Sequence, residues 1–233
     1  MAVSLDEFKK GMERLDVRDF RMKKIWHGFE YYKVDRKAGV KISLIMGYSD
    51  YADSFAIETL WVSICFKSIE KERIPFFNKY HLVCGETKTT ILQSFLIEMG
   101  DCQLKISQPE HIEILVGKVQ CILNEEMFPF VEQYSNMENV AKEIASKDLD
   151  ELPFNIAYAC PQATAMLLLK QTNSPSYKDK LRETAESLKL YVGSEVEKSG
   201  LESAEGSISV LKMFEELLHD DLEMVGYDFH HDF

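Results

Sequence analysis

The sequence lacks the short motifs by which many catalytic classes are recognised. It contains no Gly-x-Gly-x-x-Gly turn, no phosphate loop ending in Gly-Lys-Ser/Thr, no Gly-x-Ser-x-Gly elbow and no His-Glu-x-x-His pair. These absences argue against nucleotide-driven enzymes and dinucleotide cofactors, and we expect no cofactor. A catalytic triad is defined by geometry and leaves no such motif when its residues are scattered, so enzymatic activity stays open. We favour a non-enzymatic protein.

Cysteine is scarce and long apolar runs are missing. The five cysteines lie at least 18 residues apart, so no Cys-x-x-Cys pair exists to build a zinc or redox site. The first ten residues lack the apolar core of a signal peptide. The apolar run from Met166 to Leu169, with Ala163 and Ala165 before it, is far shorter than the roughly 20 residues of a membrane helix. We expect a cytoplasmic protein with reduced cysteines and no membrane partner.

Negative charge is abundant but concentrated at one end of the chain. The formal net charge is −12, and residues 194–233 carry eleven Asp and Glu against two Lys. The other 193 residues hold 28 acidic and 25 basic groups. A negative net charge disfavours attraction to phosphate backbones, so we expect no nucleic-acid partner. The acidic end favours a protein partner with a basic surface, or self-association.

The apolar pattern predicts one helix, then strands, then helices. An opening helix over 4–25 begins with the capping-box pair Ser4 and Glu7. Gly100-Asp101 predicts a tight hairpin turn. Strands are expected over 40–48, 55–67, 80–84, 90–99 and 102–107. Segregation of this kind predicts an α+β fold with an antiparallel or mixed sheet of about five strands and a C-terminal helical region.

The helices after Gln108 are predicted from caps and apolar spacing. Pro109 suits the first position of one helix, and Ser135 with Glu138 forms a second capping-box pattern. The remaining helices are expected over 161–169, over 174–192 with Gly193 as C-cap, and from 207 to a C-cap at Gly226. The domains follow as an α+β domain at 1–150, a helical extension at 151–193 packed on it, a linker at 194–206, and an acidic amphipathic helix with an aromatic tail at 207–233.

The last helix carries an apolar stripe that has to be buried somewhere. The stripe consists of Ile208, Leu211, Phe214, Leu218, Leu222 and Val225. Docking on the chain's own domain is the simplest expectation, and docking on a partner is the alternative. The alternating aromatic tail could also add to a sheet as an edge strand. The candidate partner contacts are Glu215, Glu216, Asp220, Glu223, Tyr227, Phe229 and Phe233.

Two histidine patterns were weighed as chemical sites. His219 with Asp220, and His230 with His231, are the residues closest to a divalent-metal set. Adjacent residues of an extended tail point to opposite sides, so His230 and His231 could not share one ion, and we expect no metal. His81 and Cys84 would likewise fall on opposite faces of a strand, which argues against a Cys–His nucleophile.

Two short stretches carry a resemblance to known families. They are Gly28-Phe29-Glu30-Tyr31-Tyr32 and the segment from Phe128 to Ser135. Over about residues 20–145 the chain resembles uncharacterised bacterial domain-of-unknown-function families with a helix–sheet–helix order. Some similar small acidic bacterial proteins act beside toxins as immunity factors, so the resemblance implies an immunity-like protein. It implies no site residue.

Three functions remain open at this point, the least favoured being a divalent-metal protein that uses His219, Asp220, His230 and His231. The first is a non-enzymatic cytoplasmic protein-binding module whose acidic C-terminal helix contacts the partner. The alternative is a small-molecule-binding protein or hydrolase with a pocket between the sheet and the helix at 109–127.

Overall fold

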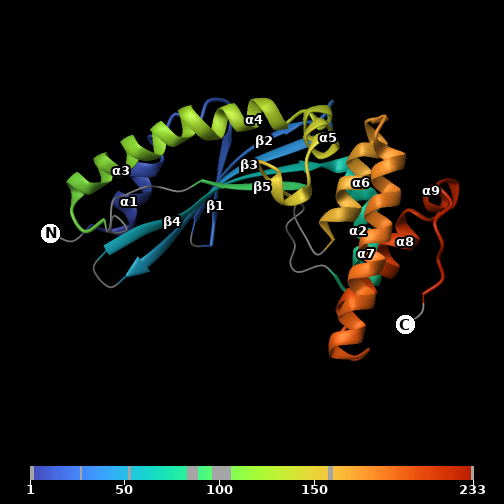
Figure 1. Cartoon of the computed structure of the whole chain (residues 1–233). Coiled ribbons are helices and arrows are strands. Elements are labelled where there is room, and N and C mark those ends of the chain that lie inside the picture. The colour runs from blue at the N-terminus through green and yellow to red at the C-terminus, as the bar shows by residue number, and fades with distance from the viewer. Residues whose placement is uncertain are drawn as a thin grey trace. The chain divides into compact units, whose positions relative to one another are not determined.

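The computed structural model of the chain describes residues 3–26, 28–51, 54–82, 89–95, 106–156 and 160–231 (Figure 1). It has the predicted α+β fold, with an N-terminal helix, a mainly antiparallel sheet and a C-terminal helical region. The chain forms two compact units. The first comprises Met1–Cys65 and Ile91–Ser135, and the second comprises Phe66–Thr90 and Asn136–Phe233.

The first unit is built on five strands that follow one another across the sheet in chain order. The pairs β1/β2, β2/β3 and β4/β5 are antiparallel. Its elements are α1 (Leu5–Met12), β1 (Arg21–Ile25), β2 (Gly28–Asp35), β3 (Val40–Tyr51), β4 (Ser54–Phe66), β5 (Ile91–Phe95), α3 (Pro109–Ile122), a π-helical turn (Leu123–Met127) and α4 (Phe128–Tyr134).

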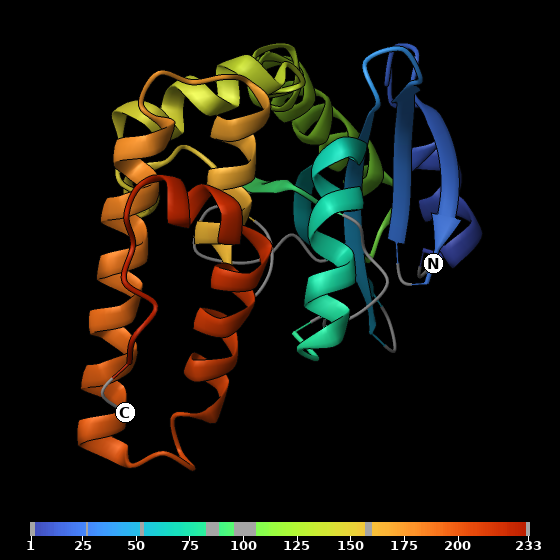
Figure 2. The ribbon, with the colours of Figure 1, turned by 90° about the vertical axis from the view of Figure 1, so that its right-hand side faces the viewer.

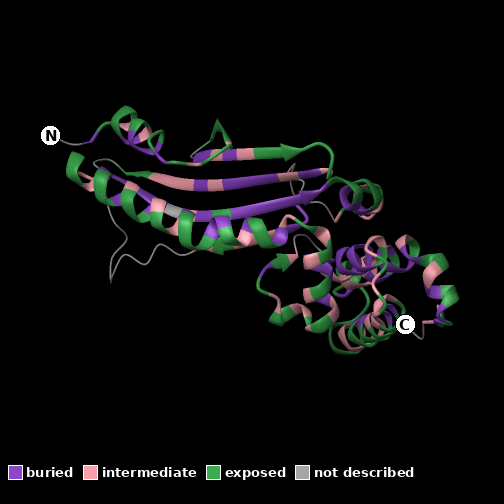
Figure 3. Cartoon of the chain, turned by 90° about the horizontal axis from the view of Figure 1, so that it is seen from above, coloured by how far each residue is buried: buried purple, intermediate pink, exposed green. Residues whose placement is uncertain are grey.

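The core of the first unit lies between one face of the sheet and α1. Phe29 pairs with Met46 and Tyr31 with Leu44, so their side chains share one buried face (Figure 3). The ring of Phe8 on α1 lies 6.4 Å from that of Phe29, between centroids. The Tyr31 hydroxyl donates a 3.0 Å hydrogen bond to the Met12 carbonyl at the end of α1. The Phe8 ring and the carbonyl at the end of α1 therefore hold the helix on the sheet.

The second unit is a bundle of helices. α2 packs against α6 and α8, and α6 and α8 both pack against α7 (Figure 2). Seven consecutive residues of α6, from Ala163 to Leu169, are buried, as predicted for this apolar helix. Its elements are α2 (Lys67–Lys79), α5 (Met137–Ser146), a 3-10 turn (Leu149–Glu151), β6 (Asn155–Ile156), α6 (Pro161–Gln171), α7 (Tyr177–Ser199), α8 (Glu205–Leu217) and α9 (His219–Met224).

Several local predictions are confirmed. The Ser4–Glu7 capping box closes in both directions, and Pro109 occupies the first turn of α3. The predicted strands at 40–48 and 55–67 correspond to β3 and β4. Part of the strand at 90–99 is β5. The predicted Gly100-Asp101 hairpin falls outside the described residues. Phe55 and Ile106 exchange backbone hydrogen bonds.

The opening helix is shorter than predicted. It ends at Met12 instead of continuing to residue 25, because Arg21–Ile25 pair as β1 with β2. The cap of α5 is also displaced by one residue: the Asn136 side chain accepts the backbone N–H of Glu138 at 2.9 Å, and Ser135 instead ends α4.

The strand predicted at 80–84 is wrong, and helix α2 was missed. Tyr80 is the C-cap of α2, and Cys84 lies outside the described residues. α2 follows directly on β4 without a side-chain cap and contains Pro75. Two of its buried positions are charged, Glu70 and Arg73, so the apolar period that identifies a helix is absent.

The predicted domain and linker boundaries are also wrong. The 1–150 domain is interrupted, because α2 belongs with the C-terminal helices. α7 continues past Gly193 to Ser199, and Gly200, with a φ of +80°, ends it. The polar residues at 194–199 belong to the C-terminal end of α7, where exposed helical positions accept them. A polar composition was therefore not evidence of a linker. Only residues 200–204 separate α7 from α8.

Candidate functional site

The apolar stripe of the C-terminal helix is buried within its own unit, as the simplest expectation had it. Leu211, Phe214, Leu218, Leu222 and Val225 are all buried. The predicted single helix is divided at Leu218, whose φ of −116° and ψ of 20° separate α8 from α9. α8 packs on α2, α6 and α7, and α9 packs on α7 and α8. These contacts occupy the stripe, so docking the stripe on a partner would require opening the unit.

Gly226 ends α9 as predicted, and its geometry turns the chain back onto the bundle. Its φ is +71°, its N–H donates to the Glu223 carbonyl, and the Tyr227 N–H donates to the Leu222 carbonyl. This is the paired hydrogen-bond pattern of a Schellman cap. Tyr227 follows the cap directly and is buried, with the Lys189 ammonium over its ring.

The aromatic tail is held by one carboxylate of α8. The Tyr227 hydroxyl donates to Oε1 of Glu215 at 2.7 Å, and Nε2 of His231 lies 3.1 Å from Oε2. The Phe229 ring stacks on His219, with centroids 4.9 Å apart. Over 227–231 the tail forms no strand, so it does not add to a sheet there. Burial, together with the Glu215 carboxylate, raises the pKa of Tyr227, so its phenol stays a proton donor.

A second carboxylate, Glu216, ties α8 to the end of α2. It accepts hydrogen bonds from Nζ of Lys79 and from the Tyr80 hydroxyl. These bonds lower the pKa of Glu216, and the bond to Glu216 raises the pKa of Tyr80 to about 12. Glu216 is thus neutralised by its own chain.

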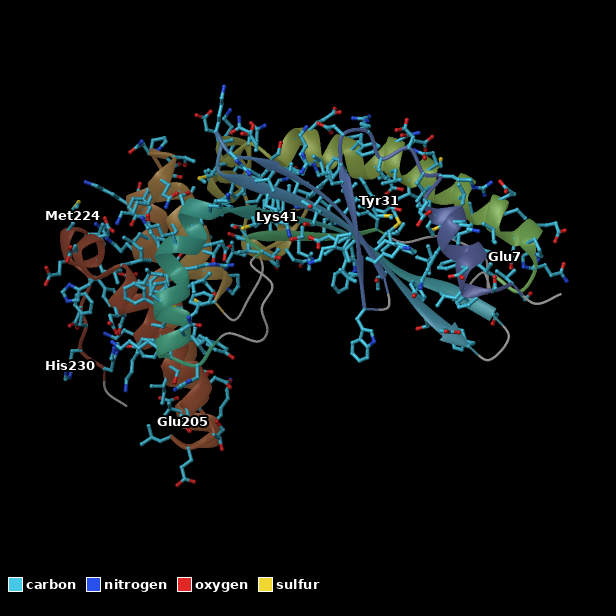
Figure 4. The ribbon with its side chains drawn as sticks, turned by 180° about the vertical axis from the view of Figure 1, so that it is seen from behind. Glu7, Tyr31, Lys41, Glu205, Met224 and His230 are labelled. Carbon is cyan, nitrogen blue, oxygen red and sulfur yellow. The ribbon has the colours of Figure 1, made fainter. Side chains whose placement is uncertain are left out.

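The predicted partner contacts therefore divide into two groups. Glu215 and Tyr227 are buried, Phe229 is half-buried against His219, and Glu216 is ion-paired. Asp220 and Glu223 are exposed, with His219 Nδ1 at 3.7 and 4.0 Å from their respective carboxylates (Figure 4 labels the adjacent Met224). Phe233 lies outside the described residues. Most of the predicted set is structural, and its exposed carboxylates are Asp220 and Glu223.

Three other carboxylates carry more of the exposed charge. Glu197, Glu202 and Glu205 surround the connection between α7 and α8, and we call them the acidic turn (Figure 4 labels Glu205). All three are exposed, and in the described part of the chain they make no ion pair. Leu201 lies between them and is 57% exposed. The Glu-rich composition of this segment predicts a linker, whereas Glu197 lies on α7 and Glu205 on α8.

The second unit also contains a groove with a volume of about 760 Å³, which we call the α7 groove. It is formed by the end of α5, the start of α6, one side of α7 and the start of α8. None of the lining residues comes from the sheet or from 109–127, where the pocket was predicted. Its apolar floor consists of Ile144, Leu149, Pro161, Met166, Leu188 and Val210.

The rim of the α7 groove is polar. Lys147 pairs with Glu143 at 2.7 Å, and Lys180 lies 3.8 Å from Asp148. Glu183 makes no ion pair among the residues that the structure describes. Three hydroxyls of the rim, on Thr184, Ser187 and Tyr191, follow one another along α7 at helical spacing. Because these groups come from separate segments, no local sequence pattern marks them as a site.

The buried polar groups of the second unit serve structure. Arg73 and Glu70 form a buried ion pair, with guanidinium Nη2 2.8 Å from Oε1. Arg73 Nη1 also donates to the Thr164 hydroxyl of α6 at 2.9 Å, and the Thr90 hydroxyl donates to Glu70 at 2.8 Å. Both charges are enclosed and satisfied, so this cluster joins α2 to α6.

The thiol and histidine groups were also considered as chemical centres. Burial raises the pKa of Cys160 to about 12 although this residue caps α6, so its thiol is a poor nucleophile. Within the described ranges, no three His, Cys, Asp or Glu residues gather where they could hold a metal ion. His231 instead faces Glu215, and the His230 N–H donates to Asp228. In the same residues no helix is long and apolar enough to cross a membrane.

Comparison with family models, with curated proteins and with solved structures finds no match to this chain. The resemblance to uncharacterised bacterial families therefore stays a prediction.

Proposed function

We propose that this protein is a non-enzymatic protein-binding module that presents an acidic surface of its second unit to a basic partner. The observation that supports it is which residues of the C-terminal end are buried and which are exposed. The apolar stripe and the aromatic tail are buried or held by contacts within the chain, whereas the three carboxylates of the acidic turn face solvent and make no ion pair among the described residues. Uncompensated charge of one sign accelerates encounter with a surface of the opposite sign.

The structure changes how this function has to be tested. Deletion of residues 194–233 would remove Phe214 and Leu222 from the core of the second unit, so loss of binding would report unfolding. A charge-neutralising variant avoids this problem. Glu197→Gln, Glu202→Gln and Glu205→Gln together remove three exposed charges and no buried contact.

The experiment is affinity capture from native cytosol followed by kinetics with the captured protein. We expect the association rate constant to fall roughly tenfold in the triple variant, and to fall with added salt for the unmodified protein. The matched control combines Asp50→Asn, Glu110→Gln and Glu126→Gln, which removes the same charge from exposed positions of the first unit. Equal capture by both triple variants, with salt-independent association, would exclude the acidic turn as the contact.

A further inference from the structure

We infer that the α7 groove receives a basic amphipathic helix of about three turns from the protein partner. The inference rests on the proposed function and names the form in which the partner is recognised. Three observations support it: the shape of the groove, its position on the side of α7 that the C-terminal tail does not contact, and its charge.

The groove follows α7 for three helical turns. The α7 residues that line it are Lys180, Glu183, Thr184, Ser187, Leu188 and Tyr191. They recur at steps of three and four and span about 16 Å at 1.5 Å per residue. A second helix of about three turns has the same length, and helix-in-groove recognition uses apolar side chains at these steps.

The groove lies on a side of α7 that the chain's own tail does not use. The tail is bound by Arg182, which donates to the Val225 carbonyl at 3.2 Å, and by Lys189, which donates to the Asp228 carbonyl at 2.8 Å. At about 100° per residue these two side chains point away from Thr184, Ser187 and Tyr191 across the helix. The docked C-terminal end therefore leaves the groove open.

The floor and the rim suit an apolar-anchored segment better than a small molecule. Pockets for small ligands enclose most of the ligand surface. Here the rim residues Glu183, Ser187 and Tyr191 are exposed, with Tyr191 at 55%, so the groove covers only one side of its occupant. An amphipathic helix needs only one side covered, because its polar side stays in water.

The charge of the groove selects a basic occupant. Both lysines of the rim already face carboxylates, Lys147 at 2.7 Å and Lys180 at 3.8 Å. Glu183 makes no ion pair in the described part of the chain, and Glu205 of the acidic turn directly precedes the lining residue Gly206. The charged lining residues balance, Lys147 and Lys180 against Asp148 and Glu183, but the adjoining Glu143 and Glu205 leave the groove region with an excess of two carboxylates. Lysine or arginine on the polar side of the incoming helix would compensate it.

The test uses a synthetic peptide of about 14 residues, with Leu at steps of three and four and Lys elsewhere, and a scrambled peptide of the same composition. Binding to the full chain is followed by fluorescence anisotropy. We expect saturable binding of the amphipathic peptide and about tenfold weaker binding of the scrambled one. Ser187→Trp should fill the groove and weaken binding about tenfold, because Ser187 is exposed and tolerates the change.

Leu190→Trp is the matched control, since Leu190 is 75% exposed on α7 and does not line the groove. Its affinity should equal that of the unmodified protein. Equal binding of both peptides, equal effects of both Trp variants, or no saturable binding would each overturn the inference. If Ser187→Trp leaves partner binding intact while the acidic-turn variant weakens it, the groove inference fails and the proposed function stands. The opposite pattern rejects the acidic turn and retains the groove.

Discussion

Tyr227 and Glu215 lie twelve residues apart, and the phenol of the one donates a 2.7 Å hydrogen bond to Oε1 of the other in the interior of the second unit. The bond joins the chain after Gly226 to the last turn of α8. It is the contact by which the aromatic tail becomes part of the core instead of a free extension.

Tyr227→Phe should therefore destabilise the protein. The buried carboxylate of Glu215 would lose a donor, and a hydrogen bond to a charged group contributes about 1.5–3 kcal/mol. The free energy of unfolding is measured by urea denaturation. Tyr191→Phe is the control, because this phenol is exposed and its removal should change the free energy by less than about 0.5 kcal/mol. Equal values for the two variants would show that the Tyr227–Glu215 bond contributes nothing.

The buried ion pair between Arg73 and Glu70 should be sensitive to loss of one partner. Arg73→Met would leave the Glu70 carboxylate buried without its cation, at a cost of about 3–5 kcal/mol. Removing both charges with Arg73→Met and Glu70→Met should cost less, because no unpaired charge remains. Both variants are compared with the unmodified chain by chemical denaturation. A double variant less stable than Arg73→Met would contradict this account.

The sequence predicted the elements whose signals are local. The cap at Ser4 and Glu7, the apolar helix at 161–169 and the C-cap at Gly226 each depend on residues within one or two turns. The fold class follows from the order of such elements. Helix α2 could not be predicted in this way, because Glu70 and Arg73 occupy buried positions. Their partners are distant in sequence: Thr90 is 20 residues from Glu70, and Thr164 is 91 residues from Arg73.

The candidate site was predicted less well for the same reason. The composition of residues 194–233 shows that carboxylates are abundant there. Whether each carboxylate is exposed depends on its partners in the folded chain. Glu216 is neutralised by Lys79, which precedes it by 137 residues. Glu197, Glu202 and Glu205 have no such partner among the described residues. The α7 groove joins four segments, and no short window of sequence contains its lining.

Glu30 of the first unit should give a stability that depends on pH. Burial raises the pKa of Glu30, but hydrogen bonds from Lys41 Nζ and Ser43 Oγ, both 2.7 Å, outweigh burial and lower it below the usual value (Figure 4 labels Lys41). A depressed folded pKa means that the stabilisation is complete above the unfolded pKa, about 4.3. It is lost as the pH falls through the folded value.

The test compares the unmodified protein with Glu30→Gln from pH 7 to pH 3. The variant should be less stable by about 1–2 kcal/mol at pH 7, and the difference should shrink below about pH 4. Glu132→Gln is the control, because its ion pair with Arg18 is exposed and contributes little at any pH. A difference that stays constant over this range would mean that ionisation of Glu30 is not involved.

Substituting alanine at Gly226 and, as a comparison, at Gly117 tests whether the backbone conformation of the C-terminal cap requires glycine. A Cβ at either position would meet no atom within 4 Å, so neither substitution introduces a clash. Gly226 has a φ of +71°, in which an L side chain is strained, so Gly226→Ala should destabilise the protein by about 1 kcal/mol. Gly117 lies inside α3, so Gly117→Ala should stabilise it by about 0.5–1 kcal/mol. Opposite signs in thermal denaturation would attribute the requirement at Gly226 to backbone conformation. Because the cap brings Tyr227 to Glu215, Gly226→Ala should also speed proteolysis of the tail. A stabilising effect of Gly226→Ala would contradict the left-handed cap.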